Sequence, residues 1–204
     1  MENIYLIRHG QDIDNSEGIL NGHRDTPLTD LGISQAESLA KYLVEQKMVF
    51  AKIFASPLKR ARKTAEIIAL SLKQEVENEY LLIERDFGEL TGHLVAEVKS
   101  LYRADIIKTE EVTYVLKYPG IESFSQMLER GKKLLIKLES LNISGDIALV
   151  TSGDIGKMIY AAYYQIDWEE ALKNFHFGNT EIVKLSPDTN PKKAVIFSCK
   201  QHNL

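Results

Sequence analysis

An arginine, a histidine and a glycine stand together near the start of the chain, at Arg8, His9 and Gly10. The planar guanidinium of an arginine matches phosphate oxygens, and an imidazole is nucleophilic near neutral pH and can accept a phosphoryl group. A glycine lets the backbone approach a ligand closely. The residue types indicate phosphate chemistry, although a triplet of this kind on its own also fits a turn with incidental polar side chains.

A second group of side chains with an affinity for anions lies further along, where four cations crowd the first turns of a predicted helix: Lys59, Arg60, Arg62 and Lys63. Cations are unusual there because the helix macrodipole is already positive at its N-terminus. Together with the unpaired N–H groups of a helix start, they predict an anion site, with Arg60 the strongest candidate. The alternative for Lys59, Arg62 and Lys63 is an ordinary solvated basic face.

The elements that must position these residues alternate in type. Short apolar runs at residues 4–7, 52–55 and 147–150 predict buried strands, and helical stripes of apolar residues follow each of them. Thr29 is the expected N-cap of the first long helix. Ser56 is the expected cap of the next, with Pro57 at its first position, and a helix is expected over 154–164. Segments 181–185 and 194–198 predict an antiparallel pair.

This alternation predicts an α/β fold, a three-layer α/β/α arrangement with a mostly parallel central sheet. Segment 84–120 fits least well, with helical pieces such as 96–104, and is expected to form a small cap excursion over one edge of the sheet. The whole chain, 1–204, is expected to be a single domain. Because ligands bind beyond the carboxyl ends of the strands in such sheets, the segments after residues 7, 55 and 150 are expected to meet in one site.

Composition narrows the class of protein. The chain has 204 residues, 44% hydrophobic and 26% charged, and 25 basic against 29 acidic residues give a net charge of −4, which disfavours nucleic acid and anionic membranes as partners. The single cysteine, Cys199, excludes an internal disulfide framework and favours a reducing, cytoplasmic location. No apolar run approaches the roughly 18 residues of a membrane span, and the N-terminus lacks the basic start of a signal peptide.

An ordered set of segments covers nearly the whole chain: residues 6–11 with Asn15, 22–29, 56–65, 84–92 and 119–130. Taken in order, these segments resemble the histidine phosphatase superfamily, which includes the cofactor-dependent phosphoglycerate mutases. The resemblance implies that His9 becomes a phosphohistidine and that Arg8 and Arg60 hold the phosphoryl oxygens. It also implies that Glu84 protonates the leaving oxygen and then activates water, without a metal or another cofactor.

The resemblance places Asn15 near the pocket, and further candidates for binding phosphate or substrate are Gly10, Asp12, His23, Arg24 and Gly153. For Glu84 to act as an acid at neutral pH, burial would have to raise its pKa. Without the surrounding motif, Glu84 would instead be interpreted as a surface carboxylate paired with Arg85. The remaining histidines, His93, His176 and His202, are expected to be structural or exposed, with His93 also close enough to line the pocket.

The chain departs from the family's pattern at two positions. Ser152 stands where the family carries its second catalytic histidine, and the loss of one preorganised donor costs on the order of 10²–10³ in rate. Backbone N–H groups at Gly153 and Asp154 could still serve the substrate. Asp12 stands where threonine or serine is common, and its carboxylate would repel a phosphate dianion unless Arg24 or Lys59 neutralises it. Asp154 could add to the repulsion.

Several functions remain open. The favoured one is a metal-independent phosphomonoesterase for a small phosphorylated metabolite, a monomer or homodimer, with its activity reduced by Ser152 and Asp12. The alternatives are a catalytically deficient phospho-ligand or partner-binding homologue, a variant in which Ser152 traps a ligand, a phosphoglycerate mutase, and a metal hydrolase built on His9, Asp12 and Asp14. Hydrolysis is favoured over isomerisation because segment 93–118 is short and not notably basic.

Overall fold

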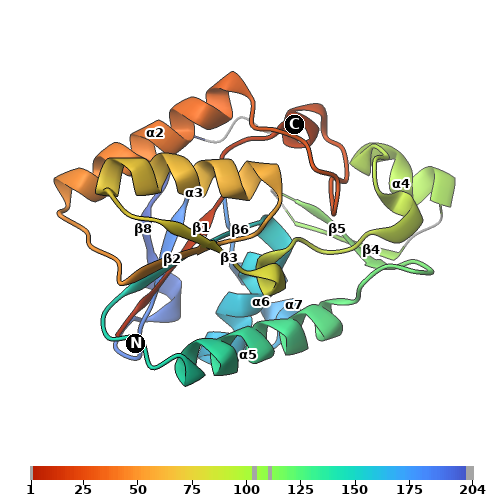
Figure 1. The fold of residues 1–204 in the computed structure, drawn as a ribbon. Helices are drawn as coiled ribbons and strands as arrows, with labels where there is room; N and C mark the ends of the chain where they lie inside the picture. The colour runs from red at the N-terminus through yellow and green to blue at the C-terminus, as the bar shows by residue number, and fades with distance from the viewer. Residues whose placement is uncertain (1, 103–104, 110–111, 201–204) are drawn as a thin grey trace.

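The structure, a computed structural model, describes residues 2–102, 105–109 and 112–200 (Figure 1). A six-stranded sheet lies at its centre, in the order β3-β2-β6-β1-β7-β8. The strands are β1 (Ile4–Arg8), β2 (Lys52–Ala55), β3 (Val76–Asn78), β6 (Ile147–Thr151), β7 (Ile182–Leu185) and β8 (Val195–Phe197). Neighbours from β3 to β1 are parallel, whereas β7 is antiparallel to both β1 and β8. The predicted mostly parallel sheet and its antiparallel tail are confirmed.

The register of the three central strands brings their carboxyl ends together. Arg8 at the end of β1 is paired with Thr151 at the end of β6, and Ala55 of β2 is paired with Val150. The backbone N–H of His9 then donates to the carbonyl of Thr151 at 2.9 Å. The segments that follow the three strands therefore start at the same edge of the sheet.

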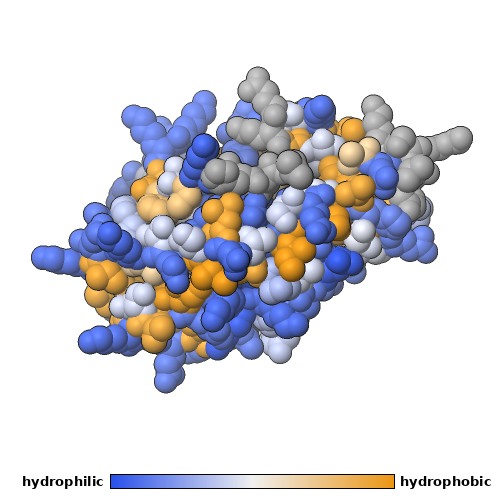
Figure 2. Space-filling model, turned by 90° about the horizontal axis from the view of Figure 1, so that it is seen from above, coloured by the Kyte–Doolittle hydropathy of each residue, from blue (hydrophilic) through white to orange (hydrophobic). Residues whose placement is uncertain are grey.

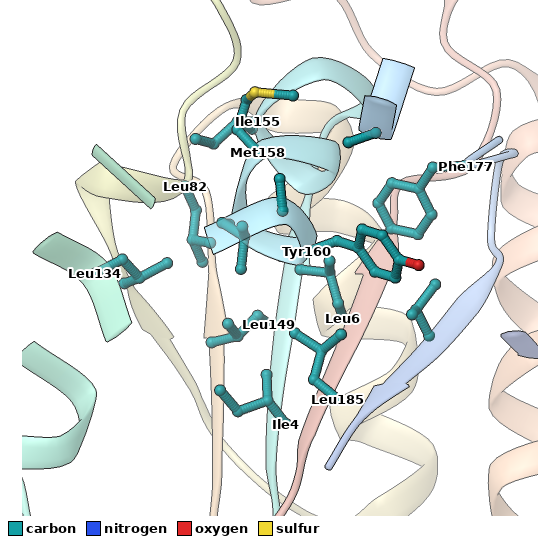
Figure 3. Packing of buried hydrophobic residues seen from close by; sticks show 14 of the residues in the cluster. Ile4, Leu6, Leu82, Leu134, Leu149, Ile155, Met158, Tyr160, Phe177 and Leu185 are labelled. Carbon is teal, nitrogen blue, oxygen red and sulfur yellow. The ribbon is translucent and has the colours of Figure 1, made fainter. Parts of the chain in front are cut away.

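Helices cover both faces of the sheet (Figure 1). One layer holds α2 (Asp30–Glu45) and α3 (Lys59–Leu72), and the other holds α5 (Phe124–Ser140), α6 (Gly153–Tyr164) and α7 (Trp168–Asn174). Alternate strand residues face opposite layers, since Leu6 packs in the cluster with Leu149 and Met158 (Figure 3) while Ile7 packs with Leu39. The predicted three-layer arrangement is confirmed.

The helix starts decide how the site-bearing loops are held. Thr29 caps α2 as predicted, because its hydroxyl accepts a hydrogen bond from the N–H of Gly32 at 3.0 Å. The prediction that Ser56 caps α3 is wrong, since the helix begins at Lys59 and its N-cap residue, Leu58, has no capping side chain. The carboxylate of Asp25, from another loop, instead accepts the N–H of Lys59 at 2.7 Å. A tertiary contact thus replaces the expected local cap.

Segment 84–120 forms the expected excursion at one side of the sheet. It contains the 3₁₀ turn η2 (Gly88–Leu90), α4 (Val95–Tyr102) and a two-stranded sheet of β4 (Asp105–Lys108) and β5 (Thr113–Lys117) that the sequence analysis did not anticipate. The expected helix over 96–104 is present as α4, but residues 103–104 lie outside the described part of the chain. Leu20 is tied to this excursion, because its N–H donates to the carbonyl of His93 and its carbonyl accepts from Gly92.

The remaining short elements are α1 (Ile13–Glu17) and the 3₁₀ turns η1 (Tyr80–Leu82) and η3 (Pro191–Lys193). Seen from above in Figure 2, the surface is largely hydrophilic, with apolar residues gathered in patches between hydrophilic ones. Within the described residues, no helix combines the length and the apolar character that crossing a membrane requires.

Candidate active site

His9 lies directly after β1 and is only 1% exposed. Its Nδ1 is 2.6 Å from the carbonyl oxygen of Gly10. A carbonyl can only accept, so Nδ1 carries the hydrogen, and in a neutral ring Nε2 then holds an unprotonated lone pair. Burial, followed by the charges of Arg60 and Arg8, lowers the pKa of His9 well below its usual value. The ring is therefore neutral and presents Nε2 as a potential nucleophile.

Arg60 is the one member of the predicted basic cluster that turns into the molecule, where it is fully buried. Its two terminal nitrogens donate to the carbonyls of Arg24 and Gly22, both at 2.7 Å. Lys59 and Lys63 are exposed, and Arg62 forms an ion pair with Glu66 at 2.9 Å. The solvated alternative thus holds for Lys59 and Lys63. Of these four cations, Arg60 is the one that brings its charge to the carboxyl end of the sheet.

Arg8 reaches the same region from the last position of β1. Its Nη1 donates to the carbonyl of Phe177 at 2.6 Å, and its Nε is buried with no hydrogen-bond partner among the described residues. The guanidinium carbon lies 3.5 Å from the point where a Cβ on Gly153 would stand, so Arg8 packs against the first residue of α6. A buried donor without a partner is rare in folded proteins and is typical of a site that a ligand completes.

Ser152 has the same property. It stands at the N-cap position of α6 and is fully buried, but its hydroxyl makes no capping bond and no other hydrogen bond within the described residues. A serine at this position ordinarily satisfies an N–H of the first turn. Ser152 and Arg8 therefore contribute two unsatisfied donors where β1 and β6 end.

Glu84 explains why Ser152 does not cap the helix. Its carboxylate accepts hydrogen bonds from the N–H groups of Asp154 at 3.2 Å and Ile155 at 3.1 Å, and from Arg85 at 2.8 Å. The expectation that the backbone N–H of Asp154 would serve the substrate is therefore wrong, because Glu84 already occupies it.

The surface alternative for Glu84 is also wrong, since this residue is 6% exposed. The side chain of Arg85 turns away from it, donates to the carbonyls of Val115 and Glu122, and lies 4.0 Å from the ring centre of Phe124. Beside Glu84, burial and the Glu84 charge raise the pKa of Asp154 from 3.8 to about 6. Two carboxyl groups thus share the start of α6.

Asp12 is buried at the other side of His9 and forms the N-cap of α1. One oxygen accepts the N–H of Asn15 at 2.7 Å, and the other, Oδ2, accepts the amide of Asn21 at 2.8 Å. Oδ2 also lies 3.2 Å from Nε of Arg60 and 4.0 Å from Nε2 of His9. Burial raises the pKa of Asp12, and Arg60 opposes this effect.

The expectation that Arg24 or Lys59 would neutralise Asp12 is wrong. Arg24 forms an ion pair with Asp14 at 2.9 Å, and Lys59 forms one with Asp25 at 3.3 Å. Both cations lie near the surface, whereas the capping role of Asp12 directs its carboxylate inward, where Nε of Arg60 lies 3.2 Å from it.

A comparison with known proteins identifies the family of this chain. The sequence profile of the histidine phosphatase superfamily (branch 1) matches residues 4–199. The chain belongs to this superfamily. Like the neighbours of known structure, the chain has a mostly parallel α/β sheet with helices on both faces.

Relatives of this chain carry several activities in their names. Phosphoserine phosphatase 1 of Hydrogenobacter thermophilus is 30% identical over 82% of this chain and 78% of its own. A 2,3-bisphosphoglycerate-dependent phosphoglycerate mutase of Nitrobacter hamburgensis is 32% identical over 62% of this chain and 63% of its own. A probable fructose-2,6-bisphosphatase TIGAR A of Danio rerio is 38% identical over 48% of this chain, but the match spans 40% of that protein. These last two matches cover less than two thirds of the relatives' own length.

Among solved structures, a phosphoserine phosphatase from Entamoeba histolytica in complex with 3-phosphoglyceric acid is similar over 90% of each chain. It has 28% sequence identity to this chain and a TM-score of 0.71.

One residue of the site, Asn179, was missed by the sequence analysis. Its buried side-chain amide donates to the carbonyl of His9 at 2.9 Å and to Oδ1 of Asn15 at 3.2 Å. No sequence motif links Asn179 to His9, since the two residues are 170 positions apart. His23 and Arg24 remain at the periphery, both exposed, and Nε2 of His23 lies 2.9 Å from the backbone carbonyl of Glu84. They are therefore placed to border the site and not to form its base.

The metal-hydrolase alternative finds no support in the arrangement of donors. In the described ranges, no three His, Cys, Asp or Glu side chains form a group that could hold a metal ion. Asp14, one of the three residues considered, is instead paired with Arg24. His202 lies outside the described residues.

Proposed function

We propose that this protein is a metal-independent phosphomonoesterase that acts through a phosphohistidine at His9 on a small phosphorylated metabolite. The observation that carries the proposal is the buried, neutral His9, which presents Nε2 in the region where Arg8 and Arg60 converge. Nε2 attacks phosphorus, the bond to the ester oxygen breaks, and water later cleaves the phosphorus–nitrogen bond to release phosphate. Phosphoryl transfer needs this kind of positioning and charge neutralisation more than further covalent chemistry.

In this mechanism Glu84 protonates the leaving oxygen and afterwards takes a proton from the attacking water. Its burial and its place at the start of α6, next to Gly153 and Arg8, support the role. Asn15, held by Asn179, and Gly10 complete the phosphate pocket. Ser152, at the position that the resemblance gives to a histidine, supplies one hydroxyl donor in its place, so we expect slow turnover.

We propose hydrolysis in preference to mutase chemistry. The phosphatase names among the relatives favour it, and so does the short excursion between His93 and Tyr118. A mutase must protect its phosphohistidine from water, which calls for a more extensive cover over the site.

A second candidate function is the binding of a phosphorylated ligand without turnover. Two observations favour it: the hydroxyl of Ser152 has no partner within the described residues, and the Glu84 carboxylate accepts three hydrogen bonds from backbone N–H groups of the described chain. Such a protein would retain Arg8 and Arg60 as anion ligands and lack an efficient route for the proton.

The test is hydrolysis of p-nitrophenyl phosphate with a chelator present. We expect slow release of p-nitrophenol by the unaltered chain, loss of activity in His9→Ala, and a rise on the order of 10²–10³ in Ser152→His. Lys63→Ala, an exposed change on the same helix as Arg60, is the matched control and should leave the rate unchanged. Absence of turnover from both the unaltered chain and Ser152→His would favour the binding function. Loss of activity on adding the chelator would contradict the metal-independent mechanism.

A further inference from the structure

Asp12 and a bound phosphoryl group would need the same cation. Both terminal nitrogens of Arg60 already donate to backbone carbonyls, those of Arg24 and Gly22. Its Nε faces the Asp12 carboxylate at 3.2 Å, with both side chains fully buried. The same carboxylate oxygen is 4.0 Å from Nε2 of His9, the atom that the proposed mechanism directs at phosphorus. A phosphoryl oxygen brought to His9 therefore arrives beside a buried negative charge.

The charges around Asp12 do not balance when a dianion enters. Arg60 from α3 and Arg8 from the end of β1 supply two positive charges, and His9 is neutral. Asp14 on α1 is paired with Arg24, while the carboxyl group of Glu84, which also acts on Arg60, accepts a backbone N–H at the start of α6. An ionised Asp12 and a phosphoryl dianion would together place three negative charges against the two arginines, and uncompensated buried charge is costly.

We propose that Asp12 sets the charge of the anion that this site accepts: a tetrahedral dianion binds with uptake of one proton on the Asp12 carboxyl, whereas a singly charged tetrahedral anion binds without it. The inference rests on the proposed function, because it concerns the same phosphate site. It makes Asp12 a specificity-determining residue for the protonation state of the phosphorylated substrate.

The direction of the pKa of Asp12 agrees with this scheme. Burial raises the pKa of Asp12, and Arg60 exerts the main opposing effect. A dianion competing for Arg60 raises it further, so the complex holds a proton at a pH where the free protein has lost it. By linkage, affinity for a dianion increases as pH falls, by up to about tenfold per pH unit when one proton is taken up. Below the pKa of Asp12 in the free protein, the affinity becomes constant.

The experiment uses sulfate and methyl sulfate as probes, because the first is a tetrahedral dianion and the second a tetrahedral monoanion, and neither titrates between pH 5 and 8. Calorimetric titration of the full chain at several pH values should show sulfate binding that strengthens as pH falls and methyl sulfate binding that changes little. Repeating the sulfate titration in buffers of different ionisation enthalpy should give uptake of about one proton per anion.

Two variants test the role of the Asp12 carboxyl group. Asp12→Asn removes the charge, and Asp12→Ser keeps a side chain able to cap α1, so at least one is expected to retain the fold, as checked by circular dichroism. Both should bind sulfate without the steep pH dependence. Asp14→Asn is the matched control, because Asp14 is a buried carboxylate two residues away that pairs with Arg24. This variant should keep the steep pH dependence of sulfate binding. The same pH dependence in the unaltered chain and in a folded Asp12 variant would overturn the inference while leaving the proposed phosphatase intact. Absence of sulfate binding to any of the proteins would overturn both.

Discussion

The carboxylate of Glu84 accepts the backbone N–H of Asp154 at 3.2 Å, and the carboxyl group of Asp154 lies partly buried beside it. Two acids thus compete for the positive end of one helix. Glu84 takes the N–H groups, and Asp154 is left with Arg85, whose Nη1 is 3.8 Å away. Together with burial, the neighbouring Glu84 raises the pKa of Asp154.

The first prediction concerns stability and the titration of Asp154. Its pKa is raised from 3.8 to about 6 in the folded protein, so between these values the folded state binds more protons than the unfolded state. The contribution of Asp154 to stability is therefore fully present below pH 4 and is lost as pH rises through 6, by about 2–3 kcal/mol. Urea unfolding of Asp154→Asn should show a gain over the unaltered chain that grows from pH 4.5 to pH 7. A gain independent of pH would contradict the assignment.

The second prediction concerns the protonation of His9. Because burial and the two arginines lower its pKa, the ring should stay neutral, with the hydrogen on Nδ1, from pH 8 to below pH 6. Nitrogen-15 NMR of the imidazole groups should show this tautomer unchanged over that range, while His23, an exposed histidine, serves as the reference in the same spectrum. Protonation of His9 near its ordinary pKa would remove the basis for a nucleophile at neutral pH.

The third prediction compares two arginines on α3. Arg60→Met should destabilise the protein by about 3–5 kcal/mol, because it leaves the buried Asp12 charge without its cation. Arg62→Ala removes a partly exposed pair with Glu66 and should cost about 1 kcal/mol or less. Chemical denaturation at pH 7 measures both. Equal losses would show that Arg60 is not the partner on which Asp12 depends.

The fourth prediction tests how Arg8 is held. A Cβ on Gly156 of α6 would come within 2.3 Å of the Phe177 ring, and the carbonyl of Phe177 accepts the hydrogen bond from Arg8. Gly156→Ala should therefore displace Phe177 and reduce kcat/KM for an aryl phosphate by about tenfold or more, since small misplacements at a reaction centre are costly. Glu139→Ala, an exposed change at the far end of α5, should leave the rate unchanged. A fully active Gly156→Ala would show that Arg8 is positioned without Phe177.

The sequence by itself determined the architecture and the location of the site. Alternating buried strands and amphipathic helices predict a mostly parallel sheet, and the carboxyl ends of parallel neighbours must lie at one edge. For this reason the sequence alone groups His9, Arg60 and Ser152. The hairpin of β4 and β5 was not predicted, because the periodicity of its sequence is weak. The hairpin is stabilised by contacts with the excursion around it, such as those of Val115 with Phe87 and Leu90.

Only the tertiary structure decided which charges meet. The sequence offered Arg24 and Lys59 as partners for Asp12, but the backbone of α1 directs that carboxylate inward to Arg60. In the same way, Asn179 reaches His9 across 170 positions. Hydrophobic periodicity is a local property that survives in the sequence, whereas the direction of a polar side chain depends on loops brought together from distant parts of the chain. The identity of the buried ion pairs, and with it the charge of the site, is therefore a property of the folded molecule.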